Sequence, residues 1–146
     1  MSKAKAIGTR AETAIRNFLL SKGYTELQAR RNVLAGSEDK GDVWLEDPEF
    51  GLIIIESKGG DMAKKASFEQ CKKWLEEAQR EKKNAGANFG FLVVQRAGVG
   101  YPRAGEWYAF ARLGDILTLC LNTLVDDDIV VRICLEDLVN IIRGEG

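Results

Sequence analysis

The sequence predicts a small α/β domain in which a mixed β-sheet is flanked by helices. Two observations predict it: segments with apolar residues at helical spacing alternate with short aliphatic runs, and 146 residues suffice for one domain with its own core. We expect a single domain over residues 1–146, with a core over about residues 8–112 and additional C-terminal helices over about residues 113–146.

Helices are predicted where apolar periodicity coincides with capping signals. Thr9 and Glu12 have the spacing of a capping box at the start of the first helix, and Gly23 is a suitable stop. Ser67 and Gln70 have the same spacing at the start of the second. The four helices are expected at residues 9–22, 67–86, 113–124 and 135–142.

Short apolar runs predict the strands. They are expected at residues 28–34, 42–45, 52–58, 89–95, 106–112 and 129–134. The four consecutive aliphatic residues at 52–55 are typical of a strand that is buried on both faces. Glycine and polar residues at 36–41 predict a loop, and the glycine-rich segment 97–105 predicts another.

Composition excludes several kinds of chemistry. The chain has no histidine, which excludes Ser-His-Asp and Cys-His catalysis and histidine-ligated zinc. The three cysteines (Cys71, Cys120 and Cys134) are scattered, which favours a reducing, cytoplasmic location over a disulfide framework. With neither an apolar run near 20 residues nor a signal-peptide pattern, we expect no membrane association. The first 103 residues carry a net charge of +4 and the remainder −5, so a basic face is possible on the N-terminal part.

Three charged residues at strand ends are the strongest candidates for chemistry. Glu56 and Lys58 follow the aliphatic run at i and i+2, so both side chains lie on the same face of the strand. If the strands at 42–45 and 52–58 pair as a hairpin, Asp42 faces Glu56 across the ladder. Two carboxylates so placed repel each other unless they share a divalent cation. The pattern therefore favours a site for Mg²⁺, with Mn²⁺ as a substitute. Lys58 would orient the attacking water or stabilise charge during hydrolysis of a phosphodiester.

These residues also resemble a known signature. Asp42 followed by Glu56-Ser57-Lys58 is similar to the motif of the PD-(D/E)xK nuclease superfamily, with Gly41-Asp42 in place of Pro-Asp. The segment 8–12 (GTRAE) resembles the N-terminal acidic motif of the Holliday junction resolvase branch. Together with Arg30-Arg31 and the segment 106–108 (EWY), the series resembles small resolvase-type proteins of bacteriophages and archaea. The resemblance covers about two-thirds of the chain and implies a restriction-endonuclease-like core.

The resemblance also implies a metal site. Asp42 and Glu56 would ligate the metal directly, and the backbone carbonyl of Ser57 would be a further ligand. Glu12 would act through water or hold a second ion. Each residue also has an ordinary interpretation: Glu12 as a capping residue, Asp42 as a turn residue, and Glu56 with Lys58 as an ion pair.

The resemblance further implies that Lys58 serves the nucleophile and that Gln70 supports the site, although Gln70 is equally explained as a helix cap. Arg10, Arg30 and Arg31 are candidates for contacts with DNA phosphates, and Arg30-Arg31 equally suits a solvated edge strand. The paired lysines at 72–73 are expected on a helix surface, with Glu76 and Glu77 as i,i+4 partners.

The function implied is a magnesium-dependent endonuclease that resolves four-way DNA junctions. Cutting two strands symmetrically calls for two active sites and hence a homodimer, in the cytoplasm of a host if the chain is phage-encoded. No nucleotide cofactor is expected, because the glycine-rich segment lacks the Gly-Lys-Ser/Thr of a phosphate loop. The alternatives are another PD-(D/E)xK nuclease of restriction, repair or exonuclease type, and a catalytically inactive DNA-binding module. The aliphatic C-terminal helices could form the dimer face or complete the core of one chain.

Overall fold

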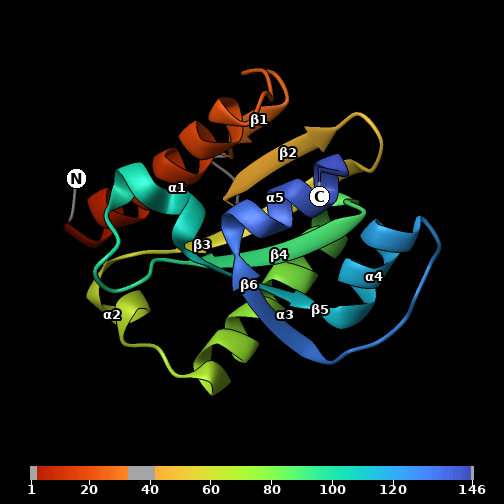
Figure 1. Ribbon diagram of the computed structural model, residues 1–146. Coiled ribbons are helices and arrows are strands. Elements are labelled where there is room, and N and C mark those ends of the chain that lie inside the picture. The colour runs from red at the N-terminus through yellow and green to blue at the C-terminus, as the bar shows by residue number, and fades with distance from the viewer. Residues whose placement is uncertain (1–2, 33–41, 146) are drawn as a thin grey trace.

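In the computed structural model the described residues form a six-stranded sheet as the middle layer, and helices cover both of its faces (Figure 1). The structure describes residues 3–32 and 42–145. The strands follow one another across the sheet in chain order, β1 to β6. Strands β3 and β4 are parallel and all other neighbours are antiparallel. The predicted mixed sheet flanked by helices is confirmed.

The strands are β1 (Ala29–Arg31), β2 (Val43–Asp47), β3 (Gly51–Lys58), β4 (Phe89–Val94), β5 (Tyr108–Arg112) and β6 (Val130–Cys134). The helices are α1 (Lys3–Ser21), α2 (Gly60–Lys64), α3 (Phe68–Ala85), the 3₁₀ helix η1 (Tyr101–Glu106), α4 (Leu113–Leu121) and α5 (Leu135–Arg143). Helix α3 connects the parallel strands β3 and β4, as a crossover between parallel strands requires.

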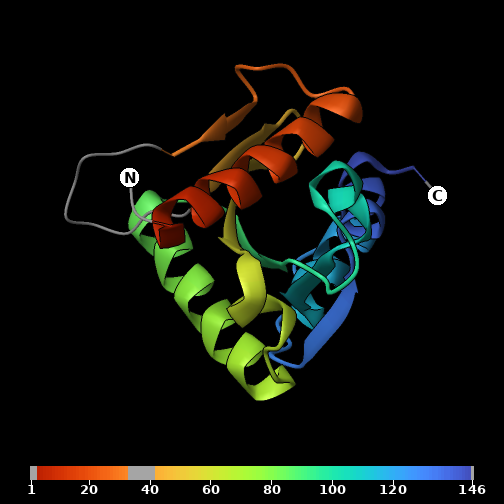
Figure 2. The same ribbon diagram turned by 90° about the vertical axis from the view of Figure 1, so that its left-hand side faces the viewer.

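Helices α1 and α3 lie on opposite sides of the sheet, which therefore has a core on each face (Figure 2). Ile53 and Ile55 of β3 belong to the larger core with α1 and α5. The smaller core contains Trp74 of α3 and Leu92 of β4. Ile54 is fully buried as well, which confirms that this strand is covered on both faces.

The start of the first helix was predicted wrongly. Helix α1 begins at Lys3, so Thr9 and Glu12 lie in its interior and form no capping box. Residues 3–7 are mostly alanine and lysine, which favour helix, and the helix extends through them. At the start of α3 the Ser67 cap is confirmed, because Ser67 Oγ accepts a hydrogen bond from the backbone N–H of Gln70, whereas the reciprocal bond of the capping box, from the Gln70 side chain, is not formed among the described residues.

Other elements also differ from the prediction. The glycine-rich segment contains η1, and the following strand begins at Tyr108 rather than at residue 106. Helix α4 ends at Leu121, because Asn122 adopts the left-handed conformation that terminates helices. Helix α2 was not predicted. The loop predicted at residues 36–41 lies outside the described residues.

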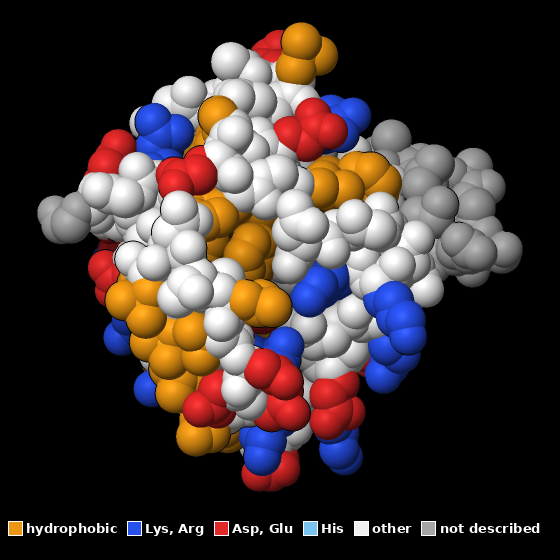
Figure 3. All heavy atoms as spheres, turned by 90° about the vertical axis from the view of Figure 1, so that its right-hand side faces the viewer, with side chains coloured by type: hydrophobic (Ala, Val, Ile, Leu, Met, Phe, Trp, Pro, Cys, Tyr) orange, Lys and Arg blue, Asp and Glu red, His pale blue; other side chains and the backbone are white. Residues whose placement is uncertain are grey.

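The C-terminal segment completes the core of one chain. Strand β6 pairs with β5, and α5 buries Leu135, Leu138, Val139 and Ile142 in the core shared with α1. Of the two roles considered for the C-terminal helices, α5 therefore has the second, because it completes the core of one chain. Hydrophobic side chains that do not join the core gather over α4 and the segment after it (Figure 3), where Leu121, Leu124 and Ile129 are exposed. No helix among the described residues has both the length and the apolarity to cross a membrane.

Candidate active site

The hairpin of β2 and β3 brings Asp42 next to Glu56. Val43 pairs with Ile55 in the ladder, so Asp42 and Glu56 occupy the next opposed positions, as predicted. Asp42 Oδ2 accepts a hydrogen bond of 2.7 Å from the backbone N–H of Ser57 and one of 3.4 Å from the Ser57 hydroxyl. These bonds fix the Asp42 carboxylate against the end of β3.

Glu56 is a buried carboxylate with an unused oxygen. Its exposed fraction is 5 %, and Oε1 lies 3.5 Å from Lys58 Nζ. No hydrogen-bond donor among the described residues reaches Oε2, which is also buried. Burial raises the pKa of Glu56, and repulsion from Asp42 adds to this, whereas Glu81 and Lys58 lower it; the result is a pKa of about 7. Glu56 therefore changes protonation near neutral pH.

Lys58 lies between β3 and α3. Its Nζ is 3.5 Å from Glu56 Oε1, 3.6 Å from Glu77 Oε2 and 5.3 Å from the centre of the Trp74 ring. Burial lowers the pKa of Lys58, but the carboxylates of Glu56, Glu77 and Asp42 outweigh it and leave the pKa above its ordinary value. Lys58 therefore remains an ammonium group at neutral pH.

Helix α3 contributes two site residues that sequence reasoning missed. Glu77 was predicted to pair with Lys73 on the surface, and Lys72 with Glu76. Instead Glu77 pairs with Lys58, and Lys72 pairs with Glu69 at 3.7 Å. The error arose because i,i+4 spacing describes contacts along the helix and not contacts with the sheet beneath it.

Glu81 is the second missed residue. It is 1 % exposed, and its carboxyl group interacts with that of Glu56. One signal was present in the sequence: Glu81 follows Trp74 and Ala78 on the buried face of α3, at a position where a surface glutamate is not expected.

Glu12 lies on α1, near the end of the β2–β3 hairpin that carries Asp42. Its Oε2 accepts hydrogen bonds of 3.2 and 3.1 Å from Arg31 Nε and Nη2. Burial and repulsion from Asp42 raise the pKa of Glu12, whereas Arg31 lowers it. The structure thus brings Glu12 within electrostatic reach of Asp42, with Arg31 as its direct partner.

Among the described residues, the remaining predicted residues form no hydrogen bond or ion pair with these carboxylates. Among the described residues the Gln70 side chain has no hydrogen-bond partner, and the Gln70 backbone N–H is capped by Ser67. Arg30 pairs with Glu46 at 3.2 Å and lies over the ring of Trp44. Arg10 lies over the ring of Tyr101.

The donor set suits a hard cation. Asp42, Glu56 and the backbone carbonyl of Ser57 offer only oxygen atoms, the ligands that Mg²⁺ prefers. The free, buried Oε2 of Glu56 beside a second carboxylate is the arrangement that a divalent cation stabilises. In the described part of the chain, no group of three or more acidic or cysteine side chains is placed to hold a metal ion. Water would therefore have to complete the coordination.

Comparison of the chain with models of protein families, with curated proteins and with solved structures finds no match. The relation to the PD-(D/E)xK superfamily therefore stays a prediction. A function for the chain is therefore inferred from the residues of the site.

Proposed function

We propose that the protein is a metal-dependent endonuclease that hydrolyses phosphodiester bonds in DNA. The proposal is based on the arrangement of Asp42, Glu56 and Lys58 at one end of the β2–β3 hairpin. One oxygen of Glu56 is buried there, and no donor among the described residues reaches it. Hydrolysis of a phosphodiester needs positive charge near the phosphoryl oxygens and a positioned water molecule. These residues can provide both.

A magnesium ion held by Asp42 and Glu56 would supply charge stabilisation at the phosphoryl group. The chain's own part is to hold the two carboxylates in place. The Ser57 N–H and hydroxyl fix Asp42, and the β3 backbone fixes Glu56 opposite it. Such preorganisation avoids moving charged groups during the reaction.

Lys58 is placed to orient the attacking water or to stabilise negative charge at the phosphorus. Its ammonium group is held by Glu56 and Glu77 and lies over Trp74, so its position is restricted from three sides. A charged group fixed in this way loses little conformational entropy when a substrate binds. Glu77 is therefore a positioning residue in this proposal.

The proposed substrate is branched DNA, in particular the four-way junction, and the proposed assembly is a homodimer. Both follow from the resemblance of the motif series to junction resolvases. Two symmetric cuts need two copies of the site, which a twofold dimer supplies.

A cleavage assay tests the proposal. Labelled four-way junction, duplex and single-stranded DNA are incubated with Mg²⁺ or with EDTA. Wild type is compared with Asp42→Asn and Lys58→Ala, and Asp61→Asn and Lys73→Ala are the controls because both residues are exposed and outside the site. We expect paired nicks on the junction that EDTA and both site variants abolish and both controls retain.

Other outcomes identify the alternatives. Metal-dependent cutting of plain duplex would retain the site and refute the junction preference, which would make the protein another kind of DNA nuclease. Salt-dependent DNA binding without any metal-dependent cutting would refute the nuclease and favour a binding module.

A further inference from the structure

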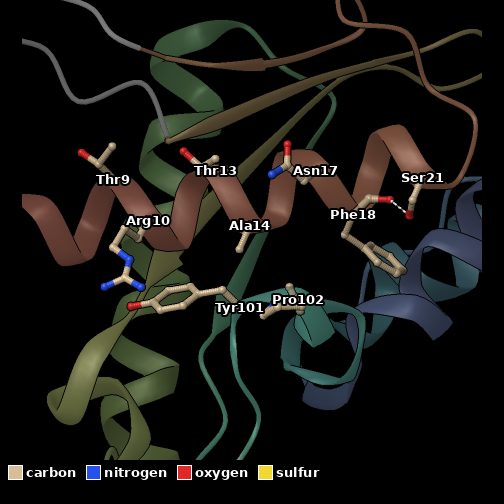
Figure 4. A pocket seen from close by; sticks show the side chains of 10 residues that line it. Thr9, Arg10, Thr13, Ala14, Asn17, Phe18, Ser21, Tyr101 and Pro102 are labelled. Atoms are coloured by element: carbon tan, nitrogen blue, oxygen red, sulfur yellow. Dashed lines mark hydrogen bonds between the residues drawn. The ribbon is translucent and has the colours of Figure 1, made fainter.

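A groove of about 530 Å³ runs between helix α1 and the 3₁₀ helix η1 (Figure 4). On α1 the rim of the groove is formed by polar residues that recur at every fourth position: Thr9, Thr13, Asn17 and Ser21. Residues at this spacing lie along one side of a helix. In Figure 4 Thr9, Thr13 and Asn17 point away from η1 and form the outer margin of the groove, and the Ser21 hydroxyl donates to the backbone carbonyl of Phe18.

The inner surface of the groove is apolar. Ala14 and Phe18 line it from α1, and Pro102 lines it from η1. In Figure 4 Ala14 and Phe18 point from α1 toward η1, below the row of polar side chains. The groove therefore combines an apolar wall with a hydrogen-bonding rim, which suits a ligand with both kinds of surface.

One end of the groove carries a cation that is available for a ligand. Arg10 is exposed, and its guanidinium lies 4.4 Å from the centre of the Tyr101 ring. Arg10 has no ion pair with any described residue. By contrast, Arg103 in η1 is bound to Glu106 at 2.7 Å. Of these two arginines, Arg10 is therefore the one whose charge remains for an anionic group.

Helix α1, which carries Arg10, packs against the end of β3. Helix α1 approaches the end of β3 so closely that a Cβ atom on Gly59 would lie 2.8 Å from the Cβ of Ala11. Gly59 directly follows Lys58, and Arg10 directly precedes Ala11. The Arg10 end of the groove thus lies near the contact of α1 with the end of β3, and the groove runs from Arg10 along α1 toward Phe18 (Figure 4).

We propose that this groove holds a single DNA strand next to the cleavage site, with a phosphate on Arg10. The inference rests on the proposed function and deepens it by placing the substrate. A nucleotide strand presents anionic phosphates and apolar sugar and base surfaces, which match the cationic end, the polar rim and the apolar wall. A volume of this size holds a ligand of small-molecule dimensions, and hence one or two nucleotides rather than a duplex.

Binding in EDTA tests the groove separately from catalysis. Anisotropy of a labelled 20-nucleotide single strand is measured over a range of salt concentrations. The groove variants are Arg10→Ala, which removes the cation, and Asn17→Glu, which adds negative charge to the rim. The matched controls are Arg103→Ala, whose charge is already paired, and Thr123→Glu, which is exposed beyond α4.

We expect each groove variant to weaken binding about tenfold at low salt, and the controls to change it less than twofold. Loss of one phosphate contact should reduce the slope of log affinity against log salt by about 0.7 in Arg10→Ala. Binding that falls equally in Arg103→Ala, or an absence of single-strand binding by the wild type, would overturn the groove proposal.

The cleavage assay separates this inference from the proposed function. If groove variants bind and cut normally while Asp42→Asn is inactive, the groove is refuted and the nuclease stands. If single-strand binding depends on Arg10 and Asn17 but nothing is cut with Mg²⁺, the groove is supported and the nuclease is refuted.

Discussion

Replacement of Glu56 by glutamine should remove the fall in the free energy of unfolding that ionisation of Glu56 causes in the wild type between pH 5 and pH 8. The folded state raises the pKa of Glu56 from 4.5 to about 7, mainly because the carboxyl group is buried. The folded state therefore binds the Glu56 proton more tightly than the unfolded state does. The stability associated with this proton is complete below pH 4.5 and is lost as the pH rises to about 7.

The size of the effect follows from the two pKa values. With 4.5 in the unfolded chain and about 7 in the folded protein, the contribution of Glu56 to the free energy of unfolding falls by about 2–3 kcal/mol between pH 5 and pH 8. Glutamine has nearly the same shape and cannot ionise. Glu56→Gln should therefore lack this fall, and above about pH 7 it also loses the ion pair with Lys58.

Urea denaturation in EDTA at pH 5, 6, 7 and 8 measures the effect. Wild type is compared with Glu56→Gln and with Glu76→Gln, an exposed glutamate on the same helix as Glu77. The difference in unfolding free energy between Glu56→Gln and wild type should grow by about 2–3 kcal/mol from pH 5 to pH 8, whereas Glu76→Gln should follow the wild type. Parallel pH profiles for Glu56→Gln and wild type would refute the reasoning.

Three further predictions concern single residues. Glu77→Gln should lower the cleavage rate about tenfold at unchanged KM in steady-state kinetics, because loss of the Glu77 charge leaves Lys58 less firmly held. Glu77→Asp, which keeps the charge, should restore part of the rate. Asp47→Ala should reduce stability to urea by about 3 kcal/mol, because buried Asp47 accepts the Tyr24 hydroxyl at 2.7 Å and two backbone N–H groups. Gly90→Ala should lower stability by about 2 kcal/mol in the same assay, because a Cβ there would lie 2.8 Å from the Ala78 carbonyl oxygen.

The pairing of Asp42 with Glu56 could be predicted because it is local. A short turn joins β2 and β3, and the alternation of side chains along a strand fixes which residues face each other. The aliphatic run of β3 likewise predicted burial on both faces, and Ile53, Ile54 and Ile55 are all buried. Patterns of this kind depend only on neighbours in the sequence and on strand geometry.

Two features could not be predicted, for different physical reasons. The start of α1 was missed because the Thr9–Glu12 spacing matches a capping box, yet the residues before it also favour helix and continue it to Lys3. The roles of Glu77 and Glu81 depend on how α3 is rotated against the sheet. That rotation is set by the packing of Trp74, Leu75 and Ala78 on β4 and β5, which no local pattern encodes.

Three acidic groups from different parts of the chain surround the Lys58 ammonium: Asp42 before β2, Glu56 on β3 and Glu77 on α3. One positive charge cannot neutralise three carboxylates, so burial leaves Glu56 dependent on a proton or on a divalent cation. Both bind the same carboxylate, and they therefore compete. Under the proposed function, wild type should bind Mg²⁺ more tightly as the pH rises through 7, and the ion should restore stability at pH 8 but not at pH 5. In Glu56→Gln the added Mg²⁺ should have little effect at either pH, because the oxygen for which proton and cation compete is no longer charged.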